Sequence, residues 1–259
     1  VGMKNYLADR FKTRASDVSG GSPTQEQVID GNQYKHRYTA INLTGSSYLW
    51  YIFEAVDVRD LAGKQVTLSW YQSEAIGRLV NTNYYDSTDA PVSVQTNAVP
   101  VSLGDNRYSY TFTMPDKVFG STPNVAGFQF FLKYNGGEDP LTDGNYDTWN
   151  VQFEPGSVAT PFENVIYQTQ LANCERYYQV FNSRTFLFLR SSDGTKKLAN
   201  IFYRTTMRVS PNATIDDANS AGTMTWSNNS TDRQGYVTNG SAAAGSDTYC
   251  NSIILDAEL

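Results

Sequence analysis

One strongly polar segment of the chain places tyrosine rings beside short polar side chains. Tyr84 and Tyr85 follow Asn81 and Asn83, and carboxylates come directly after them. A ring offers a flat apolar face to the C–H side of a sugar, and neighbouring amides and carboxylates can hydrogen-bond its hydroxyl groups. Residues 81–89 therefore predict an exposed loop that binds a ligand through Tyr84 and Tyr85. Two alternatives stay open: rings that fold back over a hydrophobic core, and a protein interface, where tyrosine is enriched.

A second group of the same kind lies near the C-terminal end. Trp226 precedes Asn228 and Asn229, and Tyr236 follows a glycine in another polar stretch. The segment 212–245 is rich in Asn, Ser, Gly and Ala, which is typical of short exposed strands joined by polar loops. These four side chains are therefore candidate ligand-binding residues, with the same alternatives.

A third group has the spacing of calcium ligands. Asp143, Asn145 and Asp147 stand at positions one, three and five of a twelve-residue loop that Glu154 would close. Thr148 replaces the glycine that the sharp turn needs, and the next residues alternate like a strand. The pattern favours a polar turn that enters a strand. Calcium held by Asp143, Asn145 and Asp147 is the alternative, and we expect no other cofactor.

Catalytic patterns are scarce. The single histidine, His36, disfavours a histidine-based triad or a histidine-rich metal centre. The 26 acidic residues offer many carboxylate pairs for glycoside hydrolysis, but sequence spacing selects none of them. The chain contains no nucleophile-elbow, zinc-protease or phosphate-loop motif. We therefore expect a protein that is not an enzyme.

Charge and composition disfavour two classes of partner. A net charge of -6 repels phosphate backbones, which disfavours nucleic acid. The longest strongly apolar stretch, residues 48–53, is far shorter than the roughly 20 residues of a spanning helix, which disfavours membrane insertion. Because the chain begins with Val1, we expect a processed product or a fragment of a longer protein. Cys174 and Cys250 are expected as unpaired, buried thiols.

Most of these candidates lie in sequence that alternates with a period of two. Such alternation puts successive side chains on opposite faces of a sheet. Turn-forming residues separate the runs, and no helical pattern lies between them, which favours an antiparallel β-sandwich over residues 1–165. The expected strands are 38–43, 48–56, 66–71, 108–114, 128–134 and 149–153.

The period then changes. Over residues 165–181 one helical face would carry Leu171, Cys174, Tyr178 and Phe181, and we expect these four side chains to be buried. Strand patterns return at 185–189, 198–207, 223–226 and 249–255. The prediction is an all-β protein with a sandwich over 1–165, one connecting helix, and a smaller β domain that completes 166–259.

Four strings of the chain are distinctive: VRDLAGKQVTLS at residues 58–69, VQFEPGSVATPFE at 151–163, LANCERYYQ at 171–179 and DAEL at 256–259. They resemble segments of bacteriophage tail-fibre and related virion proteins. The tetrapeptide ADRF at 8–11 is also similar to a sequence of this family. The resemblance implies a jelly roll like a carbohydrate-binding module, followed by a small C-terminal β domain at the tip of a fibre. The family has no uniform catalytic residues to carry over.

The expected function is that of a non-enzymatic tail-fibre tip that binds a host-surface receptor, most simply a glycan. Fibres have cyclic symmetry, so we expect a homotrimer, located in the virion beside other phage proteins. We expect the C-terminal loops with Trp226 and Tyr236 to contribute more than the 81–89 segment. Two alternatives remain: a structural or capsid-decorating virion protein without receptor binding, and a polysaccharide depolymerase.

Overall fold

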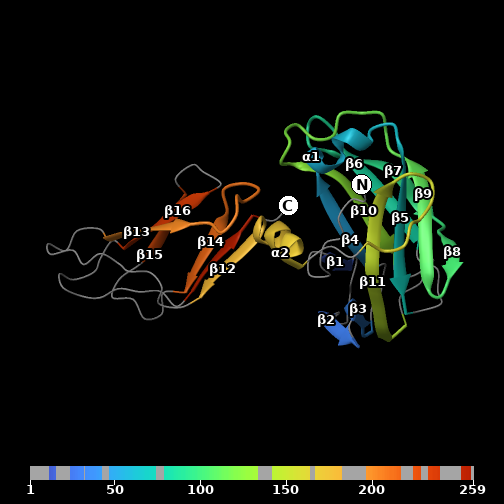
Figure 1. Cartoon of the computed structure of the whole chain (residues 1–259), viewed down its shortest axis with the longest axis horizontal. Coiled ribbons are helices and arrows are strands. Elements are labelled where there is room, and N and C mark those ends of the chain that lie inside the picture. The colour runs from blue at the N-terminus through green and yellow to red at the C-terminus, as the bar shows by residue number, and fades with distance from the viewer. Residues whose placement is uncertain are drawn as a thin grey trace. The chain divides into compact units, whose positions relative to one another are not determined.

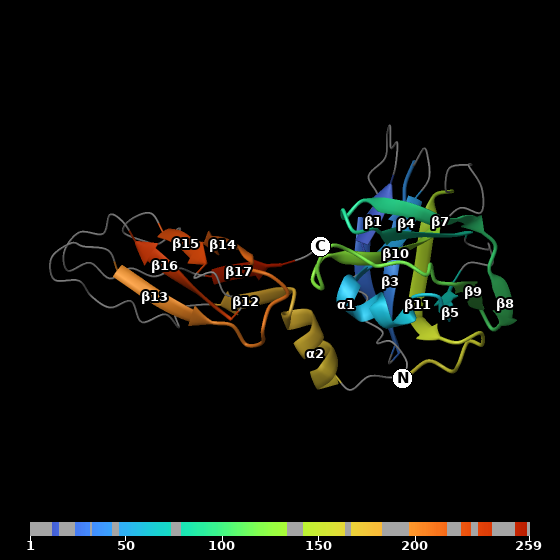
Figure 2. The ribbon, with the colours of Figure 1, turned by 90° about the horizontal axis from the view of Figure 1, so that it is seen from above.

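A computed structural model of the chain describes most of its residues in two compact units, Val1–Ile166 and Tyr167–Leu259. Figure 1 shows the ribbon, and Figure 2 shows it from above. No helix among the described residues is long and apolar enough to cross a membrane. The described ranges are 12–15, 24–31, 33–42, 47–73, 79–133, 142–163, 167–182, 197–216, 224–228, 233–239 and 252–257.

The first unit is a sandwich of two antiparallel sheets, which confirms the expected all-β fold. One sheet has five strands, in the order β1 (Lys12–Ala15), β4 (Ser47–Glu54), β10 (Ala126–Lys133), β6 (Leu79–Tyr85) and β7 (Pro91–Ala98). The other has six, in the order β2 (Thr24–Asp30), β3 (Gln33–Ala40), β11 (Gly144–Pro155), β5 (Gln65–Gln72), β9 (Arg107–Thr113) and β8 (Val101–Gly104).

Aromatic alternation builds the core between the two sheets. On β10, Phe128, Phe130 and Leu132 are all buried, while the residues between them face away from the core cluster. From the other sheet, Phe153 lies 5.8 Å from Phe128 and 5.0 Å from Phe53, measured between ring centroids. Because one face of each strand is committed to this core, the opposite face is left for other contacts.

A glycine lets the chain after β4 pack closely against β10. The short helix α1 (Ala55–Val58) and the 3-10 turn η2 (Arg59–Leu61) follow β4 directly. A Cβ atom added to Gly127 of β10 would lie 2.5 Å from the Cα of Ala55. Only glycine fits there, and a β-bulge between Ala126 and Phe128 marks the same place.

The second unit has a helix and two three-stranded antiparallel sheets. One sheet has the order β12 (Tyr178–Asn182), β17 (Ser252–Asp256) and β14 (Asn212–Asp216). The other has the order β13 (Lys197–Phe202), β16 (Gln234–Asn239) and β15 (Met224–Asn228). Its separate core contains Ile201, Met207, Val237, Ile253 and Leu255. The expected strand at 185–189 lies outside the described residues.

The helix is shorter than expected. Helix α2 spans Tyr167–Glu175, and the chain turns where the Tyr177 N–H donates to the Cys174 carbonyl. Tyr178 then pairs with Asp256 on β17, so the aromatic and branched residues after the helix form a strand. The expected burial of one helical face is therefore wrong.

The four side chains of that expected face lie in two different elements. Leu171 and Tyr178 are exposed, whereas Cys174 and Phe181 are half-buried. Cys250 lies outside the described residues, so the unpaired state of both cysteines stays a prediction.

Candidate functional site: a groove on the five-stranded sheet

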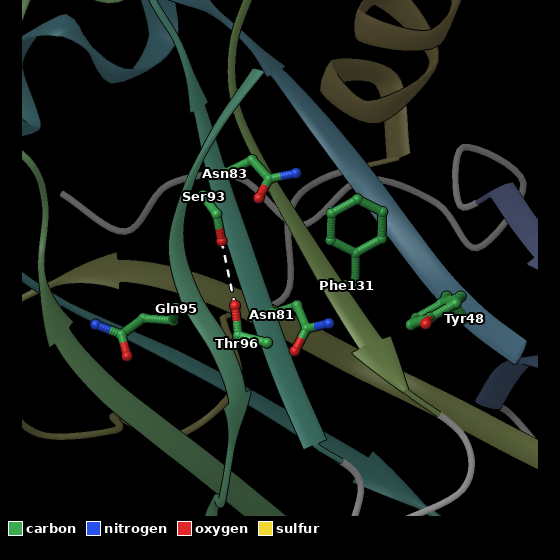
Figure 3. Close-up of a pocket in the computed structure, with 7 residues that line it drawn as sticks. All are labelled: Tyr48, Asn81, Asn83, Ser93, Gln95, Thr96 and Phe131. Atoms are coloured by element: carbon green, nitrogen blue, oxygen red, sulfur yellow. Dashed lines mark hydrogen bonds between the residues drawn. The ribbon is translucent and has the colours of Figure 1, made fainter. Parts of the chain in front are cut away.

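A groove of about 340 Å³ lies on the outer face of the five-stranded sheet. Strands β4, β10, β6 and β7 contribute to it, with two aromatic rings toward one side and hydroxyl and amide groups toward the other (Figure 3). Seven of the described residues line it: Tyr48, Asn81, Asn83, Ser93, Gln95, Thr96 and Phe131.

Strand alternation explains why polar and aromatic groups meet there. On β6, Asn81 and Asn83 alternate with the buried Val80 and Thr82. Phe131 faces Asn81 across the β10–β6 ladder, so ring and amide share one face. The outward-facing side chains of these strands therefore line the groove, and the inward-facing ones form the core.

The rings of the groove form a continuous aromatic surface across β4 and β10. The centroid of Phe131 lies 6.0 Å from that of Trp50 with the planes 8° apart, and 5.8 Å from that of Tyr48 in an edge-on contact. All three side chains are half-buried. Packing between the rings fixes their orientation, so a ligand that stacks on them meets a preformed surface.

The polar side of the groove is partly fixed by hydrogen bonds. The Asn81 Oδ1 atom accepts from the Asn97 N–H, and the hydroxyls of Ser93 and Thr96 lie 3.2 Å apart. Asn83 is different, because its amide has no hydrogen-bond partner among the residues that the structure describes. A carboxamide can both donate and accept, so Asn83 can meet either half of a sugar hydroxyl.

The two tyrosines predicted for a loop belong instead to β6. The ladders with β10 and β7 hold the chain extended through Tyr85, and the turn begins only at Asp86. Tyr84 faces inward and packs edge-on against Phe119, with the centroids 6.1 Å apart. The prediction of an exposed loop at 81–89 is therefore wrong for its first half, because strand pairing overrides the turn preference of asparagine.

Tyr85 lies on the same face as the groove without lining it. Its hydroxyl donates to the Oε1 atom of the buried Gln129, 3.0 Å away. Burial raises the pKa of the Tyr85 hydroxyl, which keeps the donor protonated over the physiological range. Tyr85 thus supports the sheet beside the groove.

In the second unit, Trp226 lies on β15 and not in a loop. It is half-buried and packs against the core of this unit, and a Cβ atom added to Gly235 would overlap its indole. The exposure expected for this side chain is therefore wrong. Asn228 and Tyr236 lie on β15 and β16, but their side chains, like the whole of Asn229, lie outside what the structure describes.

Of the three candidate metal ligands, Asn145 and Asp147 lie at the start of β11 and Asp143 directly precedes it, and their oxygens serve local contacts. Arg37 donates to both carboxylate oxygens of Asp147 at 2.7 and 2.8 Å. Asp143 accepts from the Asn42 N–H, and Asn145 from the Thr39 hydroxyl. A single twelve-residue strand separates Glu154 from them, so the chain has the ligand spacing of a calcium loop but not the folded geometry of one. Among the described residues, no group of three or more His, Cys, Asp or Glu side chains could hold a metal.

Sequence reasoning marked Asn81 and Asn83 only as neighbours of the tyrosines, and it missed the other lining residues. Tyr48 and Phe131 lie at outward positions of strands that were predicted, so the alternation in the sequence could have identified them as surface aromatic residues. The β7 residues carried no comparable signal, because exposed Ser, Thr and Gln are common in loops and strands alike.

No protein-family model matches the chain, and no curated protein matches it. Among solved structures it is similar to the enzymatically active domain of bacteriophage CBA120 tailspike protein 4, with a TM-score of 0.34, 10% identity, and 57% of this chain and 20% of that one covered. It is also similar to the CBM22-1 xylan-binding domain of Paenibacillus barcinonensis Xyn10C, with a TM-score of 0.35, 12% identity, and 60% and 91% covered.

The mannan-recognising carbohydrate-binding module TmCBM27 is similar at a TM-score of 0.31 and 10% identity, with 60% of this chain and 97% of that one covered. The chain thus spans about a fifth of the tailspike domain but most of the two modules. With TM-scores this low, the β-sandwich assignment depends on the sheets of this chain themselves.

Proposed function

We propose that the chain binds a glycan in the groove of its five-stranded sheet and does not cleave it. The observation that carries this proposal is the composition of the groove: an aromatic surface on one side, neutral amides and hydroxyls on the other. A sugar ring needs this combination, because its C–H face is apolar and its rim consists of hydroxyl groups.

The biological setting that we propose comes from the sequence. The strings at 58–69 and 151–163 resemble phage tail fibres, which supports a receptor-binding fibre tip in the virion. In that setting the ligand is a glycan on the host surface, and the chain works as a homotrimer with other virion proteins. The groove now replaces the C-terminal loops as the preferred binding site.

The proposal is tested with a glycan array and two groove variants. Phe131→Ala removes the ring that packs against both Trp50 and Tyr48. Asn83→Ala removes an amide that makes no hydrogen bond to a described residue. We expect Phe131→Ala to abolish detectable binding. Asn83→Ala should weaken binding by roughly 3- to 10-fold, the value of one hydrogen bond.

The matched control is Tyr71→Ala. Tyr71 is a half-buried ring that stacks on Trp149 at 5.8 Å on the outer face of the other sheet. It should leave glycan binding unchanged. If Tyr71→Ala abolishes binding and Phe131→Ala does not, the site lies on the six-stranded sheet and the groove assignment is wrong.

Host adsorption and sugar release separate the remaining alternatives. A receptor-binding tip should block phage adsorption when added as purified protein, and Phe131→Ala should fail to do so. Binding without adsorption would favour a structural virion protein. Release of reducing sugar from a bound polysaccharide would show that the protein is a depolymerase and would contradict the proposal that it does not cleave its ligand.

A further inference from the structure

One amide of the groove has a fixed orientation. The backbone N–H of Asn97 donates to the Oδ1 atom of Asn81, so the other end of this carboxamide is the NH2 group. The two ends of an amide are distinguished by their partners, and a backbone N–H can only meet an acceptor. Asn81 therefore offers the groove a donor, because its acceptor is used within the sheet.

The contact with Asn97 belongs to an irregularity of the edge strand β7. The register of β7 against β6 shifts twice, between Val80 and Thr82 and again between Thr82 and Asn83. Asn97 has a φ of +51°, in the left-handed region that asparagine tolerates. Bulges of this kind are frequent beside binding sites, because they redirect side chains. The hydrogen bond that holds this bulge thus also orients the amide of Asn81.

The NH2 group of Asn81 lies beside the aromatic surface. Asn81 and Phe131 are directly paired across the β6–β10 ladder, and both line the groove. In Figure 3 the nitrogen of Asn81 points toward the side of Phe131 and Tyr48. Side chains that face each other in such a pair have Cβ atoms about 5 Å apart. One ligand group can therefore accept from the amide and pack against a ring at the same time.

The other polar groups of the groove also offer more donors than acceptors. The Oε1 atom of Gln95 accepts from the Tyr110 hydroxyl, 3.1 Å away. The hydroxyls of Ser93 and Thr96 lie 3.2 Å apart, so one proton is used between them and the second can donate to a ligand. Among the described residues of the lining, only Asn83 has a side-chain amide oxygen that accepts from no described donor.

An acetamido group matches these features. Its carbonyl oxygen only accepts hydrogen bonds, and its methyl group is apolar. A sugar hydroxyl that accepts the same bond must in turn find an acceptor for its own proton. A carboxylate also accepts, but no described lining residue is a cation that would offset its loss of water.

We propose, on the basis of the proposed function, that the groove selects an N-acetylated sugar. The acetamido carbonyl accepts from the NH2 group of Asn81, and the methyl group packs on Phe131. Asn81 is thus the specificity-determining residue, whereas Tyr48 and Asn83 contribute to affinity for any glycan.

The experiment compares pairs of oligosaccharides that share every linkage and differ only at the acetamido position. Oligomers of β-1,4-linked N-acetylglucosamine and of β-1,4-linked glucose are one such pair, and the array includes pairs in other linkages. With the full wild-type chain, we expect the change from acetamido to hydroxyl to weaken binding about tenfold or more. The hydrogen bond accounts for roughly 3- to 10-fold and the buried methyl for about fourfold. An N-formyl ligand, which lacks only the methyl, should lose about fourfold.

Variants assign the preference to Asn81. Asn81→Asp keeps an oxygen for the Asn97 N–H but replaces the NH2 donor with a second oxygen, so the preference for the acetamido ligand should fall to about fourfold or less. Asn83→Asp is the matched control, since it places the same charge at the next outward position of β6. It should weaken both ligands and keep the ratio between them. Thermal melts check that both variants are folded.

Three outcomes would contradict the proposal, and they are distinguishable. If wild-type protein binds both members of each pair equally, or only the plain hexose, selection of the acetamido group is overturned while the proposed glycan binding stands. If Asn81→Asp keeps the full preference, the role of Asn81 is overturned in the same way. If no glycan on the array binds, the proposed function itself falls, and this inference falls with it.

Discussion

At the scale of single residues, one carboxylate organises the turn after β6, beside the groove. The Asp86 Oδ1 atom accepts from the hydroxyl and the N–H of Thr88 and from the N–H of Ala90. The Thr88 hydroxyl is the largest cause that holds the pKa of Asp86 below its ordinary value, followed by the two backbone donors. The stabilisation is therefore present above the ordinary pKa of Asp86 and is lost as the pH falls through its lowered value.

We predict that Thr88→Val raises the pKa of Asp86 toward its ordinary value, because the hydroxyl donor is lost and the shape is kept. The measurement is an NMR titration of the side-chain carboxyl. Acid unfolding of the variant should also lose less stability between neutral and low pH than the wild type does. Ser87→Ala, at the exposed neighbouring position, is the control and should leave the pKa of Asp86 unchanged. An unaltered titration in Thr88→Val would contradict the assignment.

A second prediction at this scale concerns Trp226, which packs where a glycine leaves room. Gly235→Ala places a methyl group into its indole and should lower the free energy of unfolding by about 1–3 kcal/mol, as overpacking does elsewhere. Urea unfolding measures the change. In a Trp226→Phe background the smaller ring should relieve the overlap, and the cost of Gly235→Ala should fall. An equal cost in both backgrounds would show that Trp226 is not the residue in contact.

At the scale of elements, the segment after β11 folds back over the outer face of the six-stranded sheet. Thr67 and Thr111 donate to the carbonyls of Gly156 and Ser157. Glu154, only 4% exposed, accepts from the N–H and the hydroxyl of Thr160 and from the Gln152 amide. Among the described residues, the donors to this buried carboxylate are all neutral, so hydrogen bonds and not an ion pair hold it in place.

We predict that Thr160→Val destabilises the first unit by about 1–3 kcal/mol, because a buried charged acceptor loses its 2.6 Å hydroxyl donor. Thr160→Ser keeps the hydroxyl and should cost much less. Thermal or urea unfolding of the full chain measures both variants. A loss in Thr160→Val no larger than that in Thr160→Ser would show that the hydroxyl does not supply the stabilisation.

Elements also show how far the sequence predicts this fold. β4, β5, β9 and β10 were predictable because aromatic and aliphatic residues alternate with polar ones. β6 and β7 were not, since the asparagine, threonine and other short polar residues in both strands give them the composition of a loop. Only the pairing of β6 with β10, and of β7 with β6, reveals them. Pairing between distant segments cannot be seen in local periodicity.

The candidate site was missed for the same reason. A groove is formed by residues far apart in sequence, here Tyr48, Asn83, Ser93 and Phe131, and its existence depends on the order of strands in the sheet. Composition did predict the kind of chemistry, rings beside amides. It could not predict which rings turn inward, because the register that sends Tyr84 to the core and Asn83 to the groove is set by the neighbouring strand.

At the scale of the whole molecule, a small groove sets a limit on affinity. A volume of about 340 Å³ is near the lower end for small-molecule sites, so under the proposed function each chain contacts only a few sugar units. Glycans also keep part of their hydration when bound, which makes each site weak. Firm attachment to a cell surface therefore requires several sites that act together.

This requirement leads to the last prediction, that the protein is a homotrimer and binds through avidity. Sedimentation equilibrium should give three times the 28.9 kDa mass of one chain. On a surface densely coated with the glycan, the apparent affinity should exceed that for the free glycan by about 10²–10⁴, because the second and third contacts are intramolecular. Sparse coating, with glycans too far apart for one trimer to bridge, should remove the gain. A monomeric mass together with the same gain on both surfaces would contradict this account, since a single groove cannot distinguish dense from sparse ligand.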